Sequence, residues 1–84
     1  MGEILLNNGF SDCREIGGGF IREFIRRDSG KQTVYYVSVY PYPYLTMATF
    51  HKDGKIIKRK VYRISHRRAW YSIKMAIWNQ GFEV

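Results

Sequence analysis

The stretch Thr33 to Tyr40 (TVYYVSVY) decides the fold that this sequence predicts. Apart from Ser38, each of its side chains is β-branched or aromatic, and such side chains pack well on the pleated surface of a sheet. Pro41 and Pro43 follow directly, and proline lacks the N–H group that the hydrogen bonds of a sheet require. We therefore expect a strand over this stretch that ends at the two prolines.

Further strands are expected on both sides of this stretch. On its C-terminal side, Tyr44 to His51 and Ile56 to Ile64 flank Asp53-Gly54, a dipeptide typical of a two-residue hairpin turn. On its N-terminal side, Asp28 to Lys31 (DSGK) indicates another hairpin turn, which follows Phe20 to Arg27. We expect a strand over Phe20 to Arg27. Its apolar positions also fit one face of a helix, and a helix is the alternative.

The C-terminal part of the chain predicts one helix. Ser65 is a typical N-cap residue, Arg67 to Asn79 has helical periodicity, and Gly81 stands where helices commonly end. One side of this helix is apolar and is expected to pack on the sheet. That side consists of Ala69, Trp70, Ile73, Ala76 and Ile77.

The N-terminal part is the least regular. Glu3 to Leu6 is interpreted as a short strand, and Ser11 or Asp12 as the cap of a helical turn that runs to Ile16. Gly17-Gly18-Gly19 then interrupts that element, because glycine has no side chain to restrict its backbone.

The 84 residues fit a single domain over 1–84. We divide it into a poorly defined N-terminal segment (1–19), a β-meander (20–64) and a C-terminal helix (65–80). The predicted class is α+β: an antiparallel meander of three to four strands with one C-terminal helix packed on one face. One sheet layer under one helix layer is a standard way to bury a core.

The composition excludes several classes of protein. Hydrophobic residues make up 45% of the chain, which is typical of a globular domain and not of a disordered one. The single cysteine, Cys13, cannot form an internal disulfide, and no apolar run is long enough to span a bilayer. The N-terminus lacks the features of a signal peptide. We expect a protein of a reducing, cytoplasm-like compartment with no role at a membrane.

The residues that commonly carry chemistry form no recognisable catalytic or metal site. Two histidines, His51 and His66, accompany one cysteine, and the seven acidic residues are scattered along the chain. We therefore expect no catalytic residue, no metal and no cofactor, and we interpret the protein as a non-enzyme. His66 lies beside Arg67 and Arg68 in the sequence and is expected to join a basic surface.

The net charge of +7 is confined to the last third of the chain. Residues 1–51 hold five basic and five acidic side chains, whereas residues 52–84 hold nine basic and two acidic ones. A positive field of this kind attracts phosphates, and binding that depends on it weakens with salt. The sequence therefore indicates a polyanion, most readily DNA or RNA, as the partner.

A dense basic run is the strongest candidate for contact with phosphates. Along an extended strand, Lys58 and Lys60 point to one face and Arg59 and Arg63 to the other, which indicates an edge strand or a protruding hairpin. The alternative is that these charges only protect an edge strand from aggregation, for which one or two lysines suffice. With His66, the predicted contact residues are Lys52, Lys55, Lys58, Arg59, Lys60, Arg63, Arg67 and Arg68.

The segment Tyr40 to Tyr44 (YPYPY) alternates tyrosine with proline, which imposes an extended path. The tyrosine rings therefore cannot all enter one core, and at least one is expected to be exposed. Exposed rings beside a basic surface can stack on unpaired bases, so Tyr42 and Tyr44 are predicted to contact nucleic acid. The alternative is that these tyrosines cap the core with their hydroxyl groups in water.

The predicted helix has more apolar positions than one core-facing side needs. Tyr71, Met75 and Trp78 form a second stripe near Lys74. A large apolar stripe on a small domain requires a covering surface. We expect either a homodimer or another protein partner to cover it, or the N-terminal segment of the same chain.

The order of strands followed by a helix is similar to the single-strand-binding domain of transcriptional coactivators, which dimerise through their helices. It is also similar to the small three-stranded DNA-binding domains of some integrases and of plant AP2-type factors. This likeness concerns architecture and assigns no residues here. The basic run and the tyrosine segment together predict nucleic-acid binding as the function. The alternative is a small protein-interaction module or inhibitor, of the kind that phages and mobile elements encode, docking on an acidic or nucleic-acid-handling protein.

Overall fold

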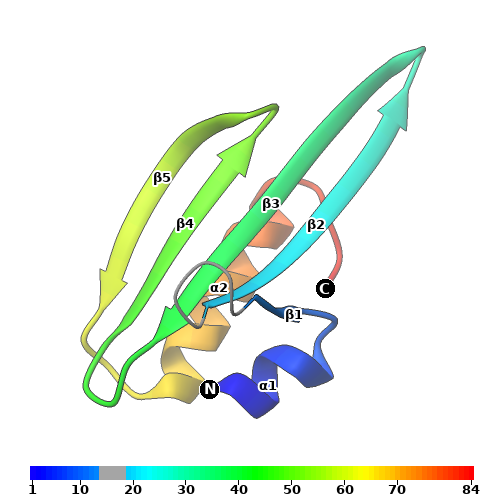
Figure 1. Cartoon of the computed structure of the whole chain (residues 1–84). Coiled ribbons are helices and arrows are strands. Elements are labelled where there is room, and N and C mark those ends of the chain that lie inside the picture. The colour runs from blue at the N-terminus through cyan, green and yellow to red at the C-terminus, as the bar shows by residue number, and fades with distance from the viewer. Residues whose placement is uncertain (14–18) are drawn as a thin grey trace.

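The computed structural model describes residues 1–13 and 19–84. Within them, five antiparallel strands follow one another in a meander, and two helices flank the sheet (Figure 1). The elements are α1 (Gly2–Asn7), β1 (Ser11–Cys13), β2 (Gly19–Asp28), β3 (Lys31–Pro41), β4 (Thr46–Lys52), β5 (Lys55–Tyr62) and α2 (His66–Asn79). The predicted α+β class, the antiparallel meander and the C-terminal helix are confirmed. The predicted strand count of three to four is too low, because β1 was not foreseen.

The N-terminal part differs from the prediction in both of its elements. Glu3 to Leu6, expected as a strand, lies in α1. The helix lets the neighbouring residues Ile4 and Leu5 both contact the core, whereas a strand would turn them to opposite sides. Ser11 to Cys13, expected to begin a helical turn, pairs with β2 instead and satisfies part of its edge. The rest of that turn and Gly17-Gly18 lie outside the described residues.

Both predicted hairpin turns are present. Ser29 and Gly30 have φ values of 49° and 79°, and Asp53 and Gly54 have φ values of 50° and 83°. Two successive residues with positive φ are the signature of the tight turn that matches the twist of a hairpin. Asp53 is also tied to β3, since its carboxylate accepts a hydrogen bond from the Val34 amide at 2.9 Å. These turns fix the register of β2 with β3 and of β4 with β5.

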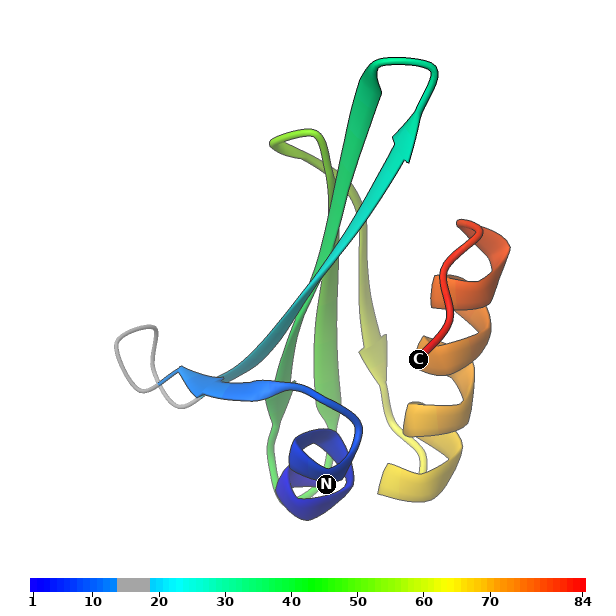
Figure 2. The same cartoon turned by 90° about the vertical axis from the view of Figure 1, so that its right-hand side faces the viewer.

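The core lies between one face of the sheet and α2 (Figure 2). The predicted sheet-facing side of the helix is confirmed: four of its members are buried, and Ala76 is partly buried against the same core. Ser65 caps the helix by accepting a hydrogen bond from the Arg68 amide at 3.3 Å. At the other end, Gly81 has a φ of 86°, and the chain reverses so that Phe82 enters the core.

The other face of the sheet, turned away from α2, is here called the open face. In Figure 2 the helix lies along one side of β3 and β4, and no described helix covers the opposite side. Because side chains alternate along a strand, every second residue of β2 to β5 points to the open face. No helix within the described ranges is long and apolar enough to cross a membrane.

Candidate nucleic-acid interface

β5 is an edge strand of the sheet, which is one of the two arrangements that the charge pattern indicated. It pairs only with β4, and its residues from Lys55 to Val61 are all exposed. Lys58 and Lys60 lie opposite Phe50 and Ala48, which belong to the core, so both lysines are on the helix side of the sheet. Arg59 lies opposite Thr49 on the open face. Cations therefore project from both faces of one exposed strand.

The remaining predicted cations extend this line in both directions. Lys52 and Lys55 flank the turn before β5, and Arg63, Arg67 and Arg68 are exposed between β5 and the first turn of α2. None of these cations forms an ion pair with an acidic side chain of residues 1–13 or 19–84. We call the whole set the basic edge: Lys52, Lys55, Lys58, Arg59, Lys60, Arg63, Arg67 and Arg68.

The ring of His66, predicted to join the basic surface, has partners within the chain. It is half-buried, with Nε2 3.2 Å from the Tyr42 carbonyl oxygen and Nδ1 3.3 Å from the Met1 amine. A neutral ring protonated at Nε2 satisfies both contacts, as donor to the carbonyl and acceptor from the amine. His66 therefore fastens the start of α2 to the loop between β3 and β4.

Two of the predicted tyrosines lie on that loop. Tyr44 is 92% exposed and Tyr42 is 46% exposed, which confirms that the alternation with proline keeps at least one ring out of the core. The Tyr42 amide donates to the Leu45 carbonyl at 2.8 Å, and this bond closes the loop and delays the start of β4 to Thr46. Tyr40 differs from both, because its ring lies on the sheet over Gly19.

The open face carries a feature that the sequence analysis missed. Two adjoining hollows of about 420 Å³ and about 380 Å³ share Ser38, Tyr40 and His51 in their lining. The pairing of the strands explains them, because directly opposed residues share a face. One such row runs across four strands and forms the floor: Ile21, Ser38, Thr49 and Arg59.

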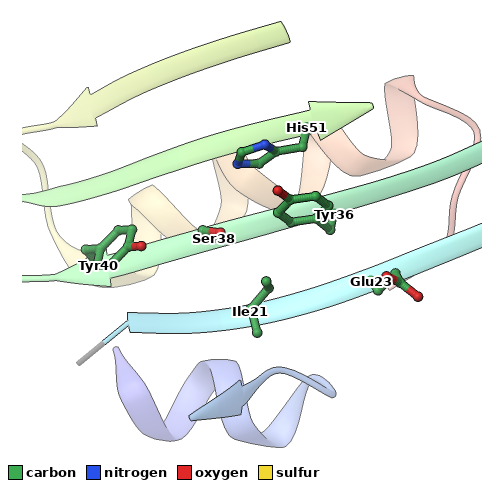
Figure 3. Close-up of a pocket in the computed structure, with 6 residues that line it drawn as sticks. All are labelled: Ile21, Glu23, Tyr36, Ser38, Tyr40 and His51. Atoms are coloured by element: carbon green, nitrogen blue, oxygen red, sulfur yellow. The ribbon is translucent and has the colours of Figure 1, made fainter. Parts of the chain in front are cut away.

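Larger side chains stand on both sides of this row. One flanking row contains Tyr36 and His51, and the other contains Tyr40 and Met47. We call the depression between them the cross-sheet groove. The sequence held a signal for it: Tyr36, Ser38 and Tyr40 alternate on one face of β3, so a small residue lies between two large ones (Figure 3).

The wall of the groove at Tyr36 is a stacked pair of rings. The centroids of Tyr36 and His51 are 3.9 Å apart and their planes differ by 8° (Figure 3). Partial burial and the positive charge of Arg59 lower the pKa of His51 from its ordinary value of 6.5. The imidazole is therefore neutral near pH 7, and the stacked pair is an uncharged aromatic group beside a cation.

Two of the three residues of the second stripe of α2 are exposed, and Met75 is partly buried. Tyr71 and Trp78 are 60% and 47% exposed, and Lys74 Nζ lies 5.8 Å and 5.5 Å from the centres of their rings. Of the predicted coverings of this stripe, the N-terminal segment does not supply one within its described residues, because it packs elsewhere. Phe10 contacts Trp70, on the core side of the helix, with ring centroids 5.8 Å apart.

Among the residues that the structure describes, no group of three or more His, Cys, Asp or Glu side chains is arranged to hold a metal ion. Comparison with protein-family models, with curated proteins and with solved structures finds no match for this chain. Function is therefore inferred from the geometry of the molecule.

Proposed function

We propose that this protein binds nucleic acid and that the basic edge contacts the phosphates. The observation that carries the proposal is a line of exposed cations on both faces of an edge strand, none of them paired with an acidic side chain within residues 1–13 and 19–84. An unpaired cation keeps its full attraction for phosphate, whereas a paired one is largely neutralised.

The dimensions of the basic edge suit a polynucleotide backbone. The eight residues of β5 span roughly 27 Å. Phosphates along one strand of a duplex recur at intervals of roughly 3.4 Å along the axis, so several of them fit beside β5 at once. Lys58 and Lys60 reach from one side of the strand and Arg59 from the other, which allows β5 to lie in a groove with phosphates on both sides.

Protection of the edge against aggregation is a weaker explanation of these charges. One or two lysines suffice to keep an edge strand from pairing with another chain. Here the cations continue beyond β5 to Arg63, Arg67 and Arg68, where no strand needs protection. A role in binding accounts for the whole line of charges.

A second candidate function is supported by the exposed stripe of α2. Tyr71, Lys74, Met75 and Trp78 form a partly apolar surface of the kind that protein interfaces use. A second copy of the chain or an acidic protein partner fits this surface. Sedimentation velocity over a range of protein concentrations tests the first case. Self-association that Trp78→Ser abolishes supports a homodimer, and a monomer at all concentrations excludes one.

The main proposal is tested by titrating the purified protein into labelled single-stranded and double-stranded oligonucleotides at two salt concentrations. Micromolar or tighter binding that weakens steeply with salt is expected, because each phosphate contact releases counterions. Absence of binding to both forms at low salt would rule out the nucleic-acid proposal. The basic edge would then be assigned to a protein partner.

A further inference from the structure

The cross-sheet groove has a chemical polarity along its length. Arg59, which belongs to the basic edge, lies at one end of the floor row. At the other end, the first hollow is lined by Ile21 and by the carboxylate residue Glu23. A ligand with an anionic part and a neutral part is therefore favoured in one orientation, with its anion at Arg59.

The middle of the groove suits a flat ring system. Ser38 and Thr49 are each 6% exposed and carry hydroxyl groups on the floor, where they can donate or accept hydrogen bonds. Tyr36 and Tyr40 stand four residues apart on β3, so their Cα atoms are separated by roughly 13 Å. That distance leaves room for a planar group between the two walls.

Tyr36 and His51 stack on each other across β3 and β4, so the second face of Tyr36 is turned toward β2, over the hollow that Ile21 and Glu23 also line. A ligand in that hollow can stack on this face. Because His51 is neutral near pH 7, the pair does not itself bind an anion strongly, and its role is to stack. The anionic part of the ligand is expected to bind Arg59, which forms no ion pair among the described side chains.

A nucleotide with an unpaired base matches this arrangement of groups. Its phosphate fits the Arg59 end, and its base is planar, stacks on aromatic rings and carries hydrogen-bonding edges for the two hydroxyls. A base within a duplex does not match, because its faces are already stacked on its neighbours. Resting on the function proposed above, we infer that the cross-sheet groove receives an unpaired base of a single strand whose phosphates follow the basic edge.

The decisive comparison uses the wild-type protein and two single strands with the same number of phosphates. One is an oligothymidylate, and the other has the same backbone with abasic sites in place of every base. The abasic strand is expected to bind more weakly by roughly 5- to 150-fold for each base that occupies the groove. The same pair prepared with ribose distinguishes RNA from DNA as the preferred source of the base.

Two variants test which part of the protein stacks on the base. Tyr36→Leu keeps an apolar side chain on the strand but removes the stacking ring. It is expected to lower affinity for the oligothymidylate at least about fivefold and to leave affinity for the abasic strand unchanged. Ile25→Thr changes an exposed apolar side chain of β2 on the same face but outside the groove, and it is expected to leave both affinities unchanged. Tyr44→Ala tests whether the loop receives the base instead. Thermal unfolding of each variant verifies that it is folded.

Each outcome bears on the inference in a defined way. Equal affinity of the wild type for the two strands would overturn it while leaving the phosphate-binding function intact, and this result does not depend on any variant being folded. If affinity for the oligothymidylate falls in Tyr44→Ala but not in Tyr36→Leu, the base binds at the loop, and the inference is overturned as well. If neither single strand and no duplex binds at low salt, the proposed function itself is refuted.

Discussion

Replacing Lys58 and Lys60 with alanine removes two cations from the helix side of β5. Neither residue forms an ion pair within the described part of the chain, so each is available to one phosphate. The slope of log K against log salt changes by roughly 0.9 for each phosphate contact on duplex DNA and 0.7 on a single strand. The double variant is therefore expected to flatten the slope by about 1.8 on duplex and about 1.4 on a single strand.

The same reasoning gives the loss of affinity. If the binding that remains at about 1 M salt is unchanged, the flatter slope makes the variant about 30-fold weaker on duplex and about 14-fold weaker on a single strand at roughly 0.15 M salt. The free energy of unfolding is expected to change less than the free energy of binding. Lys60 Nζ lies 4.9 Å from the centre of the Tyr62 ring, and an exposed contact of this kind contributes about 0.5–1 kcal/mol.

The assay is fluorescence anisotropy over a series of salt concentrations, with circular dichroism as a check on folding. The matched control is Arg27→Ala with Lys31→Ala, which removes the same charge from the β2–β3 hairpin, away from the basic edge. The control is expected to leave the slope nearly unchanged. An equal change in both double variants would show that net charge alone governs binding. If the slope of log K against log salt is unchanged in the Lys58 and Lys60 variant, these residues of β5 do not contact phosphates.

Three further predictions concern titration and packing. The lowered pKa of His51 means that folding favours its neutral form, so stability is complete above about pH 6.5 and falls as the pH drops through the lower value of the folded state. Arg59→Gln should raise that pKa, which an NMR titration of the ring measures; a lower or unchanged value would contradict the assignment of Arg59 as a cause. Burial and the nearby Tyr62 raise the pKa of Tyr35 to about 12, so stability should decline as the pH rises from about 10 through 12, and urea unfolding should show a smaller decline in Tyr35→Phe. Ile73 is fully buried under the sheet, so Ile73→Ala should lower the free energy of unfolding by about 2–5 kcal/mol; a loss under about 1 kcal/mol would contradict its place in the core.

Local chemistry determined most of the secondary structure. The strand over Thr33 to Tyr40, the turns at Ser29-Gly30 and Asp53-Gly54, and the cap at Ser65 are where the sequence predicts them. Each depends on a few neighbouring residues: β-branched and aromatic side chains favour a strand, and glycine tolerates positive φ. The N-terminal part was predicted wrongly because α1 and β1 are short and are stabilised by contacts with distant residues.

The candidate sites also contain one part that the sequence predicted and one part that it did not. The alternation of Lys58, Arg59 and Lys60 across an edge strand follows from the period of a strand, and the sequence predicted it. His66 was expected at the basic surface, yet its ring is engaged by Tyr42, whose position depends on the loop. That contact joins residues far apart in the chain, so no local sequence pattern predicts it.

The sequence by itself determined which side chains of each strand share a face. Only the tertiary structure decided which of the two faces α2 covers and which residues of different strands lie side by side. The floor of the cross-sheet groove joins Ile21, Ser38, Thr49 and Arg59 through the register of three hairpins, and the Tyr36–His51 stack depends on the same register. The physical reason is that alternation is a property of one strand, whereas register and the choice of covered face are set by burying the core as a whole.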